Sequence, residues 1–223
     1  MENSKKKPDA KQFDLLQKIL KNHFDEILAQ LPEGAKRESM RDIINFRTSL
    51  SKETDRGAAL MAAAFLDERL MCLLRNRLVN DKKMSKVMFD FNGPLGTFSS
   101  RINFCYLLGL LPKNVHRELH IVRSIRNKFA HRADFMDFED PSTKSLCNSL
   151  IFHGVKPAAS AGSKFRRTVM GLLTVVELVN GETLHIVARK DYPVPDRSEA
   201  YLRVAEIYKD VTGEEYFLKY EHE

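Results

Sequence analysis

The residues of this chain best suited to chemistry lie in the segment 121–131, Ile-Val-Arg-Ser-Ile-Arg-Asn-Lys-Phe-Ala-His. Arg126, Asn127 and His131 interrupt an amphipathic helical pattern near its end. An arginine fork matches phosphate oxygens, and a histidine exchanges protons near neutral pH. Asn127 and His131 share a helix face, whereas Arg126 and His131 diverge by about 140° on a regular helix. Arg126 therefore reaches His131 only through its long side chain or across a symmetric dimer.

Positive charge is concentrated around this segment. From Arg101 to Arg132 the chain carries seven lysines and arginines against one glutamate, and this excess equals the net charge of the whole protein, +6. Such a surface attracts phosphate, nucleic acid or another anion, although a solvated basic face needs no ligand at all. Any nucleic-acid binding is expected to be weak and electrostatic. The residues expected to contact an anion or a partner are Arg117, Arg123, Arg126, Lys128 and Arg132.

Two other groups of polar residues invite a functional interpretation. His116 and His120 are one helical turn apart, a spacing that can hold zinc. However, no glutamate directly follows His116, as the zinc metalloprotease motif requires, and no third ligand is near in the sequence. We therefore expect neither a metal nor another cofactor. Asp67, Glu68 and Arg69 either face the candidate site or form the exposed stripe of an apolar helix.

Composition restricts the class of protein. With 223 residues, 43% of them hydrophobic, the chain can bury the core of one domain. Its three cysteines are an odd number and include no Cys-x-x-Cys pair, so we expect a reducing compartment without disulfides or zinc. The N-terminus lacks the apolar core of a signal peptide, and the apolar runs of the first half are too short to span a bilayer. A cytoplasmic, soluble protein without membrane contact is expected.

Helical periodicity predicts an all-α, multi-helix bundle. Apolar residues recur every three or four positions through most of the chain, as in helices with one buried face. Residues 58–66 are apolar on every side, which predicts that a helix from about 54 to 79 is buried at the centre. We expect core positions for Phe65, Leu119, Val122 and Phe129. Further helices are expected at 13–31, 40–46, 97–111, 113–131, 144–152, 165–179 and 200–211.

Turn residues separate these helices. Residues 90–96 contain the dipeptides Asn-Gly and Gly-Pro, which favour a loop. This loop is not a phosphate-binding Walker motif, because Thr-Phe replaces the required Lys-Ser/Thr after its last glycine. Loops are also expected at 133–141 and 154–163. Asn180-Gly181 either closes the preceding helix or forms a hairpin turn between extended segments at 173–179 and 183–188.

Charge and periodicity divide the chain into three regions. Residues 1–32 are a basic N-terminal arm and helix, 33–180 a helical core domain, and 181–223 a tail with one short helix. The ends carry opposite charges: the first eleven residues hold four lysines and two acids, whereas the last fourteen hold five acids and one lysine.

Three segments resemble, in order, the signature of the bacterial mannitol operon repressor family: Gly93-Pro-Leu-Gly-Thr-Phe-Ser-Ser-Arg101, Tyr106-Leu-Leu-Gly-Leu-Leu111 and Arg126 to His131. The resemblance extends from about Thr54 to Val179. It implies an all-helical regulator that represses a sugar-alcohol uptake operon and lacks a recognisable DNA-binding motif. The sequence likewise contains no helix-turn-helix with an exposed recognition helix. We therefore expect a transcriptional regulator, not an enzyme, that acts mainly through protein partners and forms a homodimer.

The segment Arg126 to His131 also resembles the Arg-x4-His motif of the HEPN superfamily, helical bundles that include metal-independent ribonucleases acting as dimers. This resemblance implies phosphate binding by Arg126, acid-base chemistry by His131 and a supporting role for Asn127. The alternative function is therefore a metal-independent endoribonuclease. The two functions differ in their demands, since a regulator needs only a binding surface, whereas a nuclease needs Arg126 and His131 at one phosphate.

Overall fold

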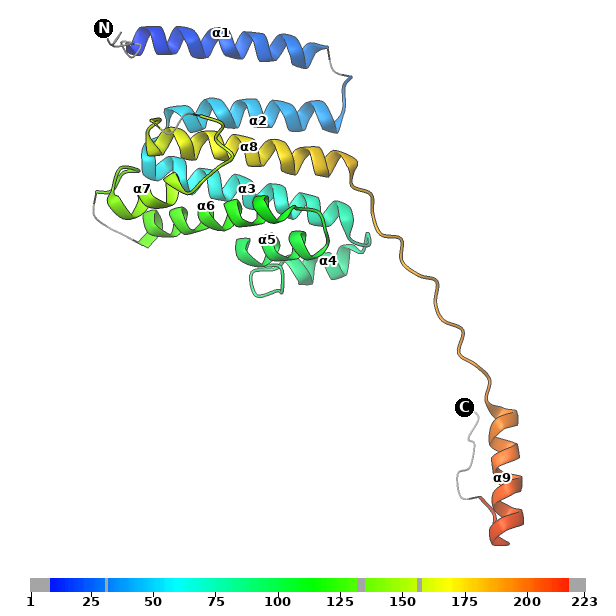
Figure 1. Ribbon diagram of the computed structural model, residues 1–223. Helices are drawn as coiled ribbons and strands as arrows, with labels where there is room; N and C mark the ends of the chain where they lie inside the picture. The colour runs from blue at the N-terminus through cyan, green and yellow to red at the C-terminus, as the bar shows by residue number, and fades with distance from the viewer. Residues whose placement is uncertain (1–8, 31, 132–134, 156–157, 217–223) are drawn as a thin grey trace. The chain divides into compact units, whose positions relative to one another are not determined.

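The computed structural model describes residues 9–30, 32–131, 135–155 and 158–216, and in these ranges it contains helices and loops but no strand. The prediction of an all-α bundle is confirmed. The chain forms two compact units, Met1–Val187 and Ala188–Glu223. The helices, labelled in Figure 1, are α1 (Ala10–Ala29), α2 (Ala35–Lys52), α3 (Asp55–Arg77), α4 (Lys82–Phe89), α5 (Phe98–Leu107), α6 (Lys113–His131), α7 (Pro141–Asn148), α8 (Ala161–Glu182) and α9 (Ser198–Thr212).

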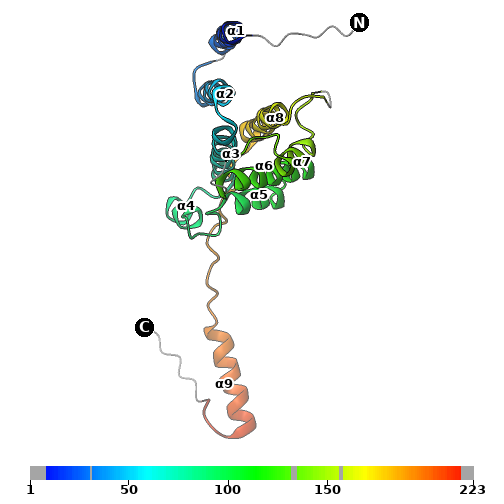
Figure 2. The ribbon, with the colours of Figure 1, turned by 90° about the vertical axis from the view of Figure 1, so that its left-hand side faces the viewer.

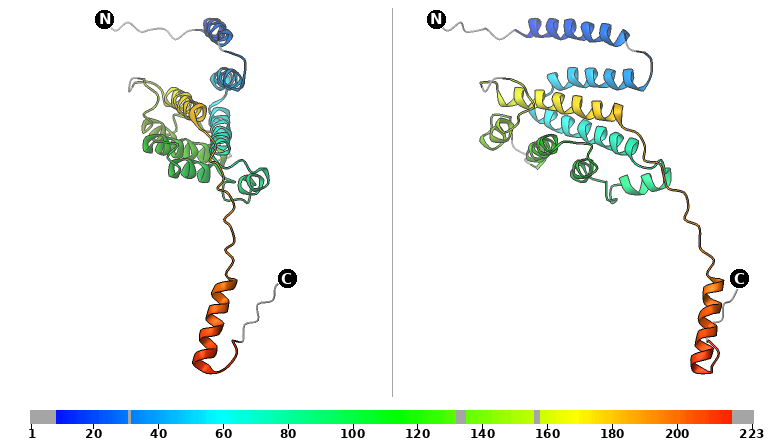
Figure 3. Two further views of the ribbon diagram at one scale, coloured as in Figure 1. Left: turned by 90° about the vertical axis from the view of Figure 1, so that its right-hand side faces the viewer. Right: turned by 45° about the vertical axis from the view of Figure 1, so that its right-hand side comes forward.

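Helix α3 is the central helix of the first unit. It contacts α2, α5, α6 and α8, and Figure 2 shows it between α2 and α8 on one side and α5 and α6 on the other. The views in Figure 3 show α8 beside α2 and α3. Ala58, Ala59 and Ala62 are fully buried, and such small side chains let neighbouring helices approach closely. The Thr54 side chain begins the helix by accepting a hydrogen bond from the backbone N–H of Gly57.

The apolar stripe of α6 packs against this central helix as expected. Leu119 and Val122 are 0% exposed and Phe129 is 1% exposed. The Phe129 ring meets that of Phe138 edge to face, with 5.1 Å between centroids. The prediction for Phe65 is wrong, because its side chain is only partly buried and stacks on Phe46 at the edge of the core.

Several helix boundaries differ from the sequence-based expectation. The helix expected at 144–152 spans Pro141–Asn148, because proline fits the first turn, where its missing N–H costs nothing. Helix α2 (Ala35–Lys52) extends well beyond the expected 40–46, and the sequence pattern does not predict α4. Helix α4 begins where the Asp81 side chain accepts a hydrogen bond from the backbone N–H of Met84.

The hairpin alternative near residue 180 is wrong. Helix α8 begins after its capping residue Ser160 and continues through Asn180 and Gly181, leaving no turn between strands. The chain then follows an irregular path to residue 197, with no strand in this described segment. Its start is attached to the end of α3, where the Ile186 N–H donates to the carbonyl oxygen of Arg77 over 2.8 Å.

Candidate functional site: a groove between α3, α5 and α6

A groove of about 790 Å³ lies where α6 meets α3 and the start of α5. Apolar and small side chains form much of its wall, and the arginines of α6 stand beside them. The residues lining it are Leu60, Ala63, Ala64 and Asp67 of α3, Phe91 and Gly96 of the loop before α5, Thr97, Phe98 and Ser99 at the start of α5, and Arg123, Arg126 and Asn127 of α6.

The loop at 90–96 shapes one wall of the groove. A Cβ atom at Gly93 would overlap the carbonyl oxygens of Val87 and Met88, and one at Gly96 would overlap those of Asp90 and Phe91, so the fold requires glycine at both positions. Leu95 anchors the loop in the core with 3% exposure. A capping box between Thr97 and Ser100 then starts α5. The loop therefore has the architectural role that its turn residues predict.

Asp67 faces the groove but is bound to another residue. Its Oδ1 lies 2.7 Å from Nη1 of Arg101, whose Nε donates to the carbonyl oxygen of Leu95 over 2.8 Å. Burial raises the pKa of the Asp67 carboxyl, and the Arg101 hydrogen bond opposes that rise. Asp67 thus connects α3 to α5. Glu68 is exposed, whereas Arg69 pairs with acids of α2 and α8, so the three residues do not form one exposed stripe.

Two arginines stand at the groove. Arg126 is exposed, and its Nη1 donates to Oδ1 of Asn127 over 3.1 Å. Arg123 is half-buried, and its Nε has no hydrogen-bond partner among the described residues. A buried donor without a partner is costly, so a ligand that accepts a hydrogen bond from Arg123 would be favoured. Phe91, with 83% exposure, adds a large apolar surface close to these charges.

The structure places His131, Lys128 and Arg117 outside the lining of this groove. His131 is the exposed last residue of α6 and is not among the residues that line the groove. Lys128 and Arg117 are eleven residues apart and lie on the same flank of α6, about 120° or more from Arg126 and Arg123. Arg117 pairs with the buried Glu118 over 3.1 Å. Arg132 lies outside the described residues.

His116 and His120 lie on the flank of α6 that contacts α5. Each Nε2 is 2.9 Å from Oδ1 of Asn103, and the His116 ring lies 4.6 Å from that of Tyr106, centroid to centroid. Burial lowers the pKa of His120, and the charges of His116 and Arg123 lower it further. In the described part of the chain, no three His, Cys, Asp or Glu side chains gather around a point that could hold a metal.

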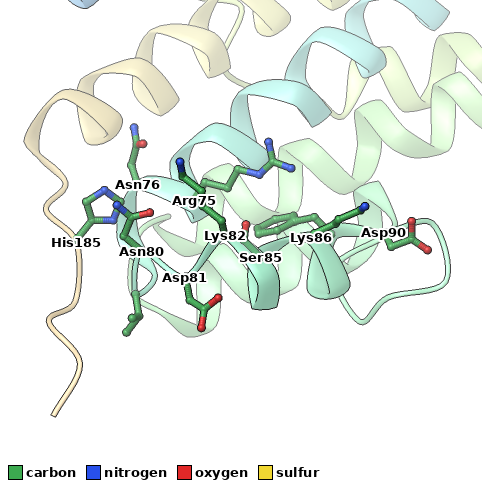
Figure 4. Close-up of a pocket in the computed structure, with 11 residues that line it drawn as sticks. Arg75, Asn76, Asn80, Asp81, Lys82, Ser85, Lys86, Asp90 and His185 are labelled. Atoms are coloured by element: carbon green, nitrogen blue, oxygen red, sulfur yellow. The ribbon is translucent and has the colours of Figure 1, made fainter. Parts of the chain in front are cut away.

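A second cavity, of about 600 Å³, lies between the end of α3, α4 and the segment after α8. Figure 4 shows Lys82, Lys86 and Arg75 at its wall together with Asp81 and His185. Several of its polar groups already serve the fold: Asp81 caps α4, and His185 Nδ1 lies 2.9 Å from the carbonyl oxygen of Leu78. We therefore regard the groove as the better candidate site.

Comparison with known proteins gives a structural likeness. No family model matches the sequence, and no curated protein matches it either. The solved structures include a similar chain in the X-ray structure of the MtlR-HPr complex from Escherichia coli, with a TM-score of 0.50 and 17% identity over 60% of this chain and 99% of that chain. The fold resembles that of MtlR. At this identity the likeness shows the fold alone.

The likeness to MtlR, the mannitol operon repressor, agrees at the level of fold with the resemblance found in the sequence. Two of the segments that carry that resemblance meet at the groove, since residues 96–99 and 126–127 both line it. The sequence offered Asp67 as one of two alternatives for the α3 side of the groove, but it did not indicate Leu60, Ala63, Ala64 or Phe91. A phenylalanine inside a turn-rich loop was the available signal for Phe91. No helix in the described ranges is long and apolar enough to cross a membrane.

Proposed function

We infer that this protein is a regulator of the mannitol operon repressor type and acts by binding a protein partner in the groove between α3, α5 and α6. The observation that carries this proposal is the composition of the groove, in which Arg123 and Arg126 stand beside an apolar wall. Support also comes from the fold, because the similar chain is MtlR, a protein crystallised with HPr.

The groove has the chemistry of a protein-binding site. Arginine and aromatic side chains dominate the energetics of protein interfaces, and both kinds occur here. Ala63 and Ala64 leave room for an apolar side chain of the partner. The arginines would bind a carboxylate beside it, and Asn127 fixes the guanidinium of Arg126 through a hydrogen bond. The preferred partner is therefore a protein of the HPr kind that presents an apolar side chain next to an acidic one.

The test is a calorimetric titration of the purified protein with HPr from the same organism. Reversal of charge in Arg126→Glu should weaken binding by about 30-fold or more, the effect of losing an interface hot spot. Lys128→Glu is the matched control, because it makes the same change on the other flank of α6. Equal losses of HPr affinity in both variants would indicate that the positive charges attract HPr at long range and do not contact it in the groove.

A second variant tests the groove without altering charge. Ala64 is exposed, so Ala64→Leu should fold normally while filling the space beside the arginines. We expect weaker HPr binding and unchanged circular dichroism. Unaltered binding in both Ala64→Leu and Arg126→Glu would show that the partner binds elsewhere, and no binding by the wild type would exclude HPr as the partner.

The endoribonuclease alternative gains less support from the geometry. A nuclease requires Arg126 and His131 at one phosphate, yet only Arg126 lines the groove. The two side chains diverge around the same helix, so a second copy of α6 would have to complete such a site. A regulator imposes no requirement of this kind, and we therefore propose that the protein is not an enzyme.

A further inference from the structure

The polar cluster between α5 and α6 brings three potential metal ligands together. Nε2 of His116 and Nε2 of His120 each lie 2.9 Å from the same atom, Oδ1 of Asn103. The two imidazoles belong to successive turns of α6, and Asn103 comes from the neighbouring helix. The sequence shows only the histidine pair; the third donor becomes visible when α5 packs against α6.

We propose that His116, His120 and Asn103 form a binding site for one divalent late transition-metal ion, Ni²⁺ or Cu²⁺. Neutral imidazole nitrogens are common ligands of these ions, and an amide oxygen is a weaker third ligand. Water would complete the coordination, since Asn103 is exposed to solvent. The site is separate from the groove and does not depend on its proposed partner.

The donor atoms are already as close to one another as coordination at right angles requires. Metal–ligand bonds of about 2.0–2.2 Å at 90° place neighbouring donor atoms about 2.8–3.1 Å apart, whereas tetrahedral angles place them about 3.3–3.6 Å apart. The observed nitrogen–oxygen separations of 2.9 Å are hydrogen bonds, and they fall in the first range, so one ion could replace them without the side chains moving apart. Octahedral or tetragonal geometry is typical of Ni²⁺ and Cu²⁺, while structural zinc is tetrahedral.

The surroundings stiffen the site and limit its affinity. The Tyr106 ring contacts His116, and the two imidazoles meet at 77° with centroids 4.6 Å apart. Among the nearby cations of α6, Arg117 is paired with Glu118, whereas the charge of Arg123 acts on His120. A cation next to the site opposes metal binding, so affinity should be below that of a site with three histidines.

The experiment uses the full, untagged chain, which is first treated with a chelator. The chelator is removed before the titration. Calorimetric titration with NiCl₂ should give one ion per chain, and thermal unfolding with the ion present should occur at a higher temperature, because a ligand of the folded state stabilises it. His116→Ala and His120→Ala should each weaken binding by about 100-fold or more, beyond the usual effect of outer-shell partners. His131→Ala on the same helix is the matched control.

A further variant separates a metal site from a simple hydrogen-bonded cluster. Asn103→Asp replaces the amide oxygen by a carboxylate, a stronger ligand, and should tighten Ni²⁺ binding by about tenfold or more. The proposal is overturned if wild type binds no Ni²⁺ or Cu²⁺, if the two histidine variants bind as wild type does, or if Asn103→Asp leaves affinity unchanged. Tighter binding of Zn²⁺ than of Ni²⁺ would overturn the assigned geometry, whereas Cu²⁺ binds such ligands more tightly than Zn²⁺ at most sites.

Discussion

The polar side chains of α6 have different roles because they project from different faces of the helix. Arg123, Arg126 and Asn127 line the groove, whereas His131 is exposed at the end of the helix. The sequence pointed to these side chains together with Arg117, Lys128 and Arg132, and helix periodicity predicts that Arg126 and His131 diverge. It could not predict that Asp67 is held by Arg101, since that ion pair joins two helices and depends on their packing.

His131 distinguishes the proposed regulator from a nuclease. Because this side chain is exposed, His131→Ala should preserve the fold, and we expect partner binding to change little. We expect no cleavage of RNA by the wild type in the presence of a chelator. Acid-base catalysis contributes about 100- to 10,000-fold in rate, so a nuclease would lose most of its activity in this variant. Strong cleavage by the wild type that is lost in His131→Ala would refute the regulator.

Two cysteines should be chemically inert in the folded protein. Burial raises the pKa of the thiols of Cys105 and Cys147 to about 12. Little of either side chain is therefore in the reactive thiolate form at pH values below its pKa. Burial also prevents a reagent from reaching the two sulfur atoms. Alkylation followed by mass spectrometry should modify both residues only after unfolding by urea. Rapid modification of either residue in the native state would show that the core around α5 or α7 opens readily.

At the scale of helices, the apolar periodicity was informative where one face packs on the core. It located α6 closely because the buried stripe of that helix is long and regular, whereas α3 was indicated by a run of residues that is apolar on every side. Periodicity does not reveal α4, because this helix is short. Asp81 followed by Met84, Val87 and Met88 is nevertheless a usable signal of a capped amphipathic helix. The groove itself was not predictable, since Ala63 and Ala64 of α3 resemble any core residues until α6 is placed beside them.

The start of α8 should make stability depend on pH. Oε1 of Glu139 accepts a hydrogen bond from the Ala161 N–H, and its other oxygen lies 3.0 Å from Nζ of Lys144. Both hydrogen bonds lower the pKa of Glu139 below 4.5, and the one from Lys144 has the larger effect. A lowered carboxyl pKa stabilises the fold above pH 4.5, and this contribution disappears as the pH falls through the folded-state pKa.

Glu139→Gln should therefore lower the melting temperature at neutral pH. The difference in melting temperature between the variant and the wild type should disappear under acidic conditions. Thermal unfolding followed by circular dichroism across this pH range measures the effect. Glu206→Gln on α9, outside the first unit, is the matched control. A difference that persists unchanged in acid would mean that the side chain acts through packing and not through its charge.

At the scale of the whole molecule, the two units differ in how their helices are stabilised. Helices α2 to α8 contribute residues to the buried core or pack against it, whereas α9 has no buried residue along its length. Removal of residues 188–223 should therefore leave the melting temperature of the first unit unchanged. Circular dichroism of the truncated and full chains tests this directly. A loss of several degrees would show that residues 188–223 contribute to the stability of the first unit.

The path from residue 188 to 197 has a consequence for binding kinetics and avidity. It connects the first unit to a 15-residue helix whose apolar side chains Leu202, Val204, Ile207 and Val211 are exposed. A short tether raises the effective concentration of a second binding element to the millimolar range, and simultaneous engagement can increase affinity by about 100- to 10,000-fold. Any partner able to contact both the groove and α9 would therefore dissociate far more slowly than either contact alone allows.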